Sequence, residues 1–481
     1  MATATLPGVR RPSVLVPAFA LNCLLVAVLL HLIGASEFIS ASMSASYDSR
    51  VAGISWCIAG TIFVVAAQYG TSRLFMFSGG FWLSVNIVFY ILLKTVELVM
   101  NDLSAGLMPA LVSVYLFMVA YIVGIALCKP LRPAVKRDYS AVTAGEWKAL
   151  YRWALGAFIL FKLFTVVAMR GAEGTTALDA SLATQNDGAA YFYRIGNLAG
   201  FWYLFLIIVS YRNRIFVRTS MFLTAYLILD AVVGAARSAI VLLVLAHLFL
   251  MHIYVRPVKL WQLLTISPVL LFVIAFFGYV RDIEIGSSVV YLDAFTLFRE
   301  NYDLVFTLFM QRMDMLPQMV KAFVLAEAGE LKMIYGASYL YEILHTVPRS
   351  LWPGKPPLTA AYLTELTEPG AFAAGVNLYS SVMVEGYINF AWAGVAVSGL
   401  LVALVTRWYE RLIYNGQLYL QVLAVSALSF PMGLINEGFH SNYLAGQLYG
   451  VALFFLTAYA CKIISPKAWR AIRAPGVPIG A

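Results

Sequence analysis

The chain has 481 residues, of which 62% are hydrophobic and only 12% are charged. A soluble protein carries roughly twice that charged fraction, so the composition excludes an ordinary soluble protein and predicts an all-α, polytopic membrane protein. The net charge of +9 would suggest nucleic acid as a partner of a soluble protein. Here it has a simpler cause, because lysine and arginine gather in cytoplasmic loops, and we expect no nucleic-acid partner.

Apolar runs of about 18 residues or more recur along the whole chain, and we interpret about twelve of them as membrane spans. The predicted spans lie near residues 14–34, 51–70, 80–100, 108–128, 149–169, 191–210, 219–236, 238–255, 260–280, 380–406, 416–436 and 442–463. Together they form a single transmembrane domain over residues 1–481. The first run follows two arginines but is longer than a signal-peptide core, so an uncleaved first helix is expected.

The charges of the connecting loops predict how these spans are oriented. Loops expected inside the cell are basic, whereas the short loops expected outside mix a few arginines with acidic residues. One missed span would invert this bias for every later loop, so both termini are expected in the cytoplasm. The seventh and eighth spans are the least secure, because residues 234–238 could instead interrupt one long broken helix.

Between the ninth and tenth spans, residues 281–379 are expected to form a large external loop inserted in the membrane domain. A segment of this length is too long for a passive connector. Leu292–Phe309 and Met315–Leu325 have apolar residues at helical spacing, which predicts short amphipathic helices on the outer face of the bundle. The hydropathy shows no two-fold repeat, which argues against a carrier.

Arginines near the outer ends of the spans are candidates for function, because ionisable groups are costly in lipid. Guanidinium groups make paired, charge-assisted hydrogen bonds to phosphate oxygens, so several of them around one outer vestibule would bind a diphosphate. Each one could instead pair with a nearby acidic residue such as Asp282 or Glu300. The predicted diphosphate-binding residues are Arg237, Arg281, Arg299, Arg312, Arg349 and Lys355.

The most specific stretch is His345–Pro357, with the sequence HTVPRSLWPGKPP. Its prolines fix the backbone, and Gly354 permits a tight turn. Such a rigid loop would present Arg349, Trp352 and Lys355 with little entropy left to lose on binding, and Trp352 could stack on the apolar face of a sugar. The stretch could equally be a proline-stiffened connector with an anchoring tryptophan.

At this point the sequence resembles a known family. Pro348-Arg349-x-Leu351-Trp352-Pro353-x-Lys355-Pro356 is similar to the signature of Wzy-type O-antigen and exopolysaccharide repeat-unit polymerases. The segment Glu385-Gly-Tyr-Ile-Asn-Phe-Ala-Trp-Ala-Gly394 also resembles that family, at the start of the span after the large external loop. The setting of Arg237 among small residues is similar as well.

The resemblance implies a GT-C-like glycosyltransferase of the bacterial inner (cytoplasmic) membrane, with its active site facing the periplasm. Its substrate would be an undecaprenyl-diphosphate-linked oligosaccharide. The growing glycan would move from polyprenyl diphosphate to the non-reducing end of a new lipid-linked unit. Membrane lipid, a chain-length regulator and a flippase are the further partners implied. We expect no cofactor and no metal, because arginines and Lys355 could stabilise the departing diphosphate and no Asp-x-Asp motif is present.

The acceptor hydroxyl would need a general base. Glu385 lies at the outer end of the tenth span, and His345 precedes the prolines. Glu437 and His440 are three residues apart near the outer end of the eleventh span, and therefore on one helical face. We rank Glu385 and His440 first, although any of these residues could be a structural partner of an arginine.

Other functions remain open at the level of sequence. An O-antigen ligase, or another GT-C-type transferase, would use the same donor and a different acceptor. A lipid-linked oligosaccharide flippase would need cationic residues at mid-depth, where Lys94 and Lys162 look isolated. A purely structural assembly subunit would leave the large external loop unexplained.

Overall fold

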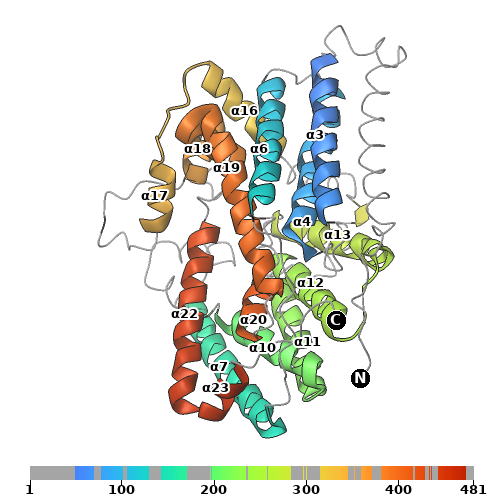
Figure 1. Ribbon diagram of the computed structural model, residues 1–481, viewed down its shortest axis with the longest axis vertical. Helices are drawn as coiled ribbons and strands as arrows, with labels where there is room; N and C mark the ends of the chain where they lie inside the picture. The colour runs from blue at the N-terminus through green and yellow to red at the C-terminus, as the bar shows by residue number, and fades with distance from the viewer. Residues whose placement is uncertain are drawn as a thin grey trace, which may run out of the picture.

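The structure is a computed structural model that describes residues 49–69, 77–100, 106–128, 142–170, 196, 198–233, 237–256, 258–282, 296, 299–300, 315–344, 352, 359–370, 381–414, 418–427, 433, 435 and 442–472. Every secondary-structure element in these ranges is a helix, and none is a strand (Figure 1). The predicted all-α class is therefore confirmed for the part of the chain that the structure describes.

Most predicted spans overlap helices in the structure, and many of the helix ends lie within a few residues of the prediction. These helices are α3 (Ser49–Tyr69), α4 (Gly79–Asn86) with the π-helical η2 (Ile87–Leu92) and α5 (Leu93–Met100), α6 (Leu107–Leu127), α7 (Ala144–Arg170), α10 (Leu198–Asn213), α11 (Val217–Val233), α12 (Arg237–Tyr254), α13 (Leu260–Asp282), α19 (Val382–Tyr414), α20 (Leu418–Ser426) and α22 (Asn442–Ile464). The short helix α23 (Pro466–Ile472) follows α22. The predicted span 14–34 lies outside the described residues.

Three helical runs are long and apolar enough to cross a membrane, judged by length and composition: Gly79–Val99, Leu107–Leu127 and Val382–Leu412. Several other described helices have shorter apolar stretches, among them Val51–Ala66 and Gly450–Ile464. The described chain thus has three candidate membrane spans and further apolar helices of the kind that membrane proteins contain.

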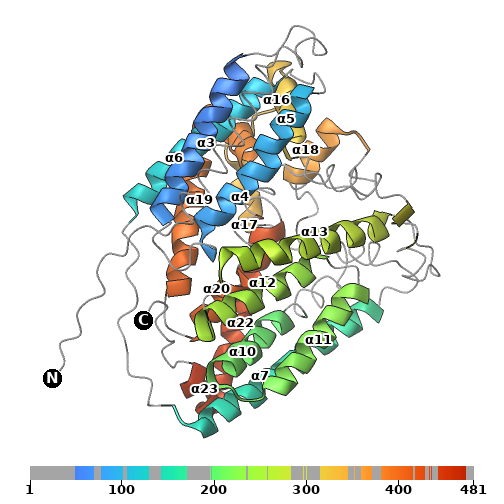
Figure 2. The same cartoon turned by 90° about the vertical axis from the view of Figure 1, so that its right-hand side faces the viewer.

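The helices form two groups that share one hydrophobic core (Figures 1 and 2). In the first group α6 packs against α3 and α19, and in the second α10 packs against α7, α11, α12 and α20. α19 also contacts α20 and so joins the groups. Small residues bring α6 and α19 together, because a Cβ atom at Gly124 or Gly399 would meet the facing helix within contact distance.

α11 and α12 are two antiparallel helices. The hydroxyl oxygen of Thr224 in α11 lies 3.3 Å from Nε2 of His247 in α12. Thr224 and His247 are about equally many residues before and after positions 234–236. Two residues so placed can meet only if the second helix runs back alongside the first. The structure therefore excludes one long broken helix in this region.

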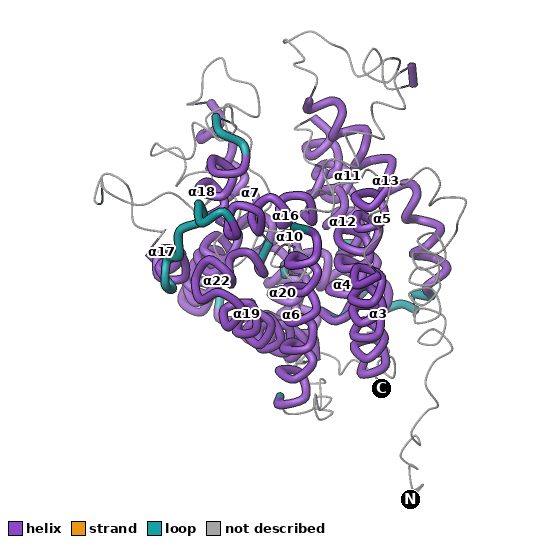
Figure 3. The backbone as a smooth tube through the Cα atoms, turned by 90° about the horizontal axis from the view of Figure 1, so that it is seen from above, coloured by secondary structure: helices purple, strands orange, loops and turns teal. Residues whose placement is uncertain are grey.

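Within residues 281–379, which were predicted to form a large external loop, the structure describes α16 (Met315–Glu327), α17 (Ala337–Leu344) and α18 (Thr359–Thr367). One face of α16 is buried, including Met315, Met319 and Phe323, and it packs against α5, η2 and α6. The predicted amphipathic helix at 315–325 is therefore confirmed, whereas most of 292–309 lies outside the described residues. Seen from above, α17 lies beside α19 and α22, away from α3 and α13 (Figure 3).

α19 is interrupted near its start. Phe390 (φ −147°, ψ 31°) and Ala391 (φ 50°, ψ −140°) have non-helical backbone angles, so a short helix up to Asn389 precedes a long one. Gly386 and Gly394 meet across the break without room for a side chain on either. The predicted span over 380–406 coincides with the candidate membrane span Val382–Leu412, but the break inside it was not predicted.

Candidate functional site

Three buried side chains join α17 to the first half of α19. The hydroxyl of Ser338 donates to Oε1 of Glu385 at 3.1 Å, and Nδ2 of Asn389 donates to that hydroxyl at 2.7 Å. The same amide nitrogen donates to the backbone carbonyl of Glu385 at 2.7 Å. We call Ser338, Glu385 and Asn389 the α17–α19 network.

The turn before α17 closes the end of the short helix. The backbone N–H of Ile334 donates to the carbonyl of Ile388 at 2.9 Å, and the N–H of Gly336 donates to Oδ1 of Asn389 at 2.9 Å. The bond from Ile334 satisfies the backbone carbonyl of Ile388, which the break in α19 would otherwise leave without a helical partner. Gly336 has φ +85°, a left-handed conformation that favours glycine.

The network is sealed from solvent. Ser338, Glu385, Asn389 and Ser398 each have 0% relative exposure, and the hydroxyl of Tyr339 lies 3.4 Å from that of Ser398. Burial, together with the nearby carboxylate of Glu385, raises the pKa of Tyr339 to about 12. Buried polar groups persist when they are hydrogen-bonded to one another, and such networks fix one arrangement of the surrounding chain.

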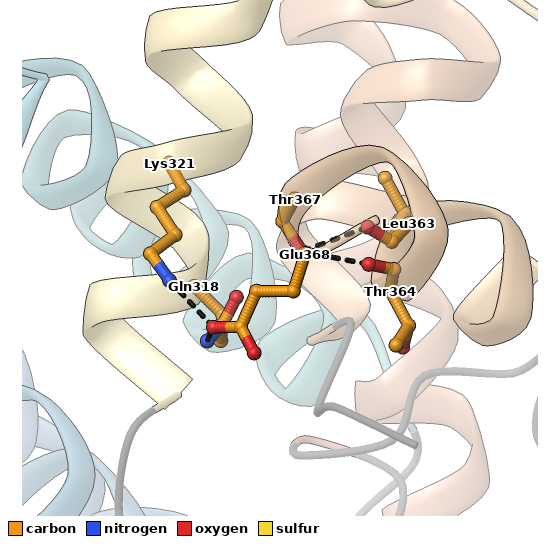
Figure 4. A network of polar contacts seen from close by, with 6 residues as sticks. All are labelled: Gln318, Lys321, Leu363, Thr364, Thr367 and Glu368. Carbon is orange, nitrogen blue, oxygen red and sulfur yellow. Dashed lines mark hydrogen bonds and ion pairs between the residues drawn. The ribbon is translucent and has the colours of Figure 1, made fainter. Parts of the chain in front are cut away.

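A second set of polar contacts holds α18 against α16 (Figure 4). Oε1 of Glu368 accepts hydrogen bonds from Nζ of Lys321 at 2.6 Å and from Nε2 of Gln318 at 3.3 Å. The bond from Lys321 lowers the pKa of the Glu368 carboxyl below its ordinary value. Because α17 and α18 flank residues 345–358, the proline-containing segment begins and ends at helices that are anchored to the rest of the protein.

The general-base candidates fall at the ends of helices that converge. Glu385 lies in the first turn of α19, buried and in contact with Ser338. His345 directly follows α17, while Glu437 and His440 precede α22; these three lie outside the described residues. α17 packs against both α19 and α22, so the described helices next to all four candidates meet in one place.

Two of the predicted diphosphate-binding positions lie at the same end of the helix bundle. Arg237 is the first residue of α12 and Arg281 is next to last in α13. Ile240 near the start of α12 packs with Phe276 near the end of α13, and the two helices run side by side (Figure 2). Both positions therefore lie at the same end of this helix pair, while the arginine side chains lie outside what the structure describes.

The structure describes only two of the other predicted diphosphate-binding and sugar-binding residues. Arg299 is exposed and Trp352 is half-buried. Arg312, Arg349 and Lys355 lie outside the described residues.

Two lysines inside predicted spans are paired, which corrects the expectation that they are isolated. Nζ of Lys162 in α7 lies 2.8 Å from Oδ2 of Asp230 in α11, and Nζ of Lys94 lies 2.8 Å from a carboxylate oxygen of Glu97. The spacing of Lys94 and Glu97 was visible in the sequence as an i, i+3 pair. The partner of Lys162 is distant in the chain, so no local pattern indicates it.

Sequence reasoning also missed Ser338 and Asn389. Asn389 is a polar residue in an otherwise apolar stretch expected to enter the membrane, and that was the available signal. Ser338 offered none, because its partners are 47 and 51 positions away. Within the described ranges, no three His, Cys, Asp or Glu side chains lie close enough together to hold a metal ion.

Comparisons with known proteins leave the site to be interpreted from its own residues. No family model, no curated protein and no solved structure matches the chain.

Proposed function

We propose that the chain is a polymerase of lipid-linked oligosaccharide repeat units, of the Wzy type, with a GT-C-like arrangement of about twelve spans. It transfers the growing glycan from undecaprenyl diphosphate to the non-reducing end of a new lipid-linked unit. The reaction takes place at the periplasmic face of the bacterial inner membrane, on the side of the bundle where α16–α18 lie.

One observation carries this proposal: the helix that leads into the first segment resembling the polymerase family, α17, is hydrogen-bonded to the second. The first, Pro348–Pro356, follows α17 by only three residues. The second, Glu385–Gly394, supplies both partners of Ser338 in α17. Segments of a shared active site are expected to be held together in this way, whereas two chance matches would have no reason to adjoin.

The chemistry requires a stabilised leaving group. The bond between the anomeric carbon of the donor glycan and the phosphate oxygen breaks, and the diphosphate leaves with the electron pair. Cations aimed at the departing diphosphate stabilise it in the transition state. Arg237 and Arg281, at one end of α12 and α13, together with Arg349 and Lys355 in the proline-containing segment, take this role.

The acceptor hydroxyl attacks the anomeric carbon and gives its proton to a base. His345, Glu437 and His440 adjoin the helices that converge at the site, and His440 is the preferred base. Glu385 is fully enclosed, and one of its oxygens already accepts from Ser338. In this arrangement Glu385 orders the chain around the site and does not reach the acceptor.

The proposal is tested with purified protein and a polyprenyl-diphosphate-linked repeat unit, by separating the lipid-linked products by length. Wild type is expected to form a ladder, and Arg349→Ala to reduce the rate by about 10²–10³-fold, the usual cost of removing one such transition-state contact. Arg411→Ala, at an exposed position in the last turn of α19, is the matched control and should polymerise normally.

The outcomes separate the candidate functions. If wild type forms no ladder from its verified substrate, the polymerase proposal fails and a ligase or a flippase takes its place. If Arg349→Ala polymerises normally, polymerase activity stands but the proline-containing segment is not the diphosphate site. A flippase is the weaker alternative, because the charge of Lys162 is already matched by Asp230 and not left to a diphosphate.

A further inference from the structure

We propose that Asn389 and Ser338 are positioning residues, which fix α17 and thereby the start of the proline-containing segment 345–357 to the first half of α19. The inference deepens the proposed function and rests on it for its kinetic test. Its structural test, the motion of α17, does not depend on any activity.

Asn389 is the centre of the α17–α19 network. Its amide oxygen accepts from the backbone of Gly336, and its amide nitrogen donates both to Ser338 and to the carbonyl of Glu385. Only a side-chain amide can accept and donate twice in this way at neutral pH. With 0% exposure, no water replaces a contact that is lost, so a change of residue type here leaves buried groups unpaired.

Ser338 extends this link to a carboxylate. It receives a hydrogen bond from Asn389 and donates one to Glu385, and it is the second residue of α17. The start of α17 is therefore bonded to two turns of the short helix in α19. Removing the hydroxyl breaks both bonds, whereas threonine keeps a hydroxyl at the same position.

α17 depends on such contacts because it is short. A helix of eight residues is not stable on its own in water, and Leu340 on its surface is 55% exposed. Its described packing partners are α19 and α22. When the network is lost, α17 is expected to move, and residues that follow it, including Arg349, move with it. A misplacement of about 1 Å at a reacting group can cost about 100-fold in rate.

The first experiment measures the motion of α17 directly. A nitroxide spin label is attached at Leu340→Cys in a chain whose four cysteines are replaced by alanine or serine. Electron paramagnetic resonance spectra are compared among wild type, Asn389→Asp, Ser338→Ala and Ser338→Thr. Ser426→Ala, which removes a hydroxyl bonded to the carbonyl of Leu423 in its own helix, is the control. Label motion should increase in Asn389→Asp and Ser338→Ala, and stay at the wild-type level in the other two.

The second experiment measures polymerisation kinetics of the same variants. Asn389→Asp and Ser338→Ala should lower kcat by about 10- to 100-fold with little change in KM, and Ser338→Thr should restore kcat.

Asn389→Asp has a further signature, which is the pH dependence of its activity. Its introduced carboxyl lies beside Glu385, with Tyr339 the other titratable group facing the network among described residues, and two adjacent carboxyls share a proton. When the introduced carboxyl is protonated, it can donate a hydrogen bond to Ser338 as the amide of Asn389 does. The activity of Asn389→Asp should therefore rise as pH falls.

The proposal is overturned if the label on α17 keeps its wild-type motion in both Asn389→Asp and Ser338→Ala. It is overturned as well if the label moves more in these variants while kcat is unchanged. It is also overturned if kcat falls but Ser338→Thr fails to restore it in a folded protein. Size-exclusion profiles and melting temperatures identify variants that do not fold, and for these the milder Ser338→Ala supplies the test. If wild type itself forms no ladder, the proposed function fails, but the spin-label result still decides whether the network positions α17.

Discussion

Gly394→Ala is expected to disrupt the break in α19. An added Cβ atom would overlap the carbonyl oxygen of Gly386 and lie 2.7 Å from its carbonyl carbon and 3.2 Å from Cβ of Phe390. The nearest obstacles are backbone atoms, which cannot rotate away, so the two halves of the helix must separate. Overpacking of this kind costs up to about 3 kcal/mol, and the better helix propensity of alanine offsets about 1 kcal/mol. The net loss of stability is therefore about 2 kcal/mol.

The assay is thermal unfolding of the purified protein in detergent, followed by the reactivity of buried cysteines such as Cys461. The entropy of unfolding, about 2.1 cal/mol/K per residue, sums to about 1 kcal/mol/K over the 481 residues. A loss of about 2 kcal/mol should therefore lower Tm by about 2 °C. Gly60→Ala is the matched control, because it lies in α3 and a Cβ atom there meets nothing within 4 Å. It should leave Tm unchanged or raise it slightly. If Gly394→Ala also keeps the wild-type Tm, the two halves of α19 do not meet at Gly386, and the account of the break is wrong.

Two further predictions concern ion pairs. Lys162→Asp should lower Tm, because it places two acidic groups together. Adding Asp230→Lys should restore most of this loss, with a coupling energy of about 1–2 kcal/mol between the two positions in a double-mutant cycle. If the two losses simply add, the pairing of Lys162 with Asp230 is wrong. The pKa of Glu368 is lowered by its bond from Lys321, so the stability this carboxylate contributes is present above its ordinary value of 4.5 and is lost as pH falls through the folded-state pKa. The protection factor of the α18 amides, which compares each exchange rate with the intrinsic rate at the same pH, should therefore fall below about pH 4.5 in wild type. Glu368→Gln should show the lower protection factor already at neutral pH. A wild-type protection factor that stays constant through this pH range would refute the account.

Much of the helix framework could be predicted from the sequence, because apolar runs and basic loops are local signals. The helix bounds 49–69, 107–127 and 442–464 agree with the predicted spans to within two residues. The break at 390–391 was not predicted, because no proline marks it. Its signal was the pair Gly386 and Gly394, whose importance depends on their meeting in space.

The candidate site could be predicted only in outline. The second resembling segment contains Glu385, which is buried and hydrogen-bonded in the structure. Its proposed role is to order the chain around the site, and the choice of His440 as the base stays a prediction. The partner of Glu385, Ser338, like the partner of Lys162, is a tertiary neighbour far away in the chain, and a single sequence contains no periodic pattern from which such a neighbour can be found.

The α17–α19 network also constrains the order of events during synthesis of the chain. Ser338 leaves the ribosome 51 residues before its donor Asn389, and at about 5–20 residues per second this delay lasts roughly 3–10 s. During that interval α16, α17 and the following segment have been made, but the chain that anchors α17 does not yet exist. The segment that contains α17 can therefore reach its final arrangement only after α19 has been made, and the synthesis of α19 is the step that completes this part of the molecule.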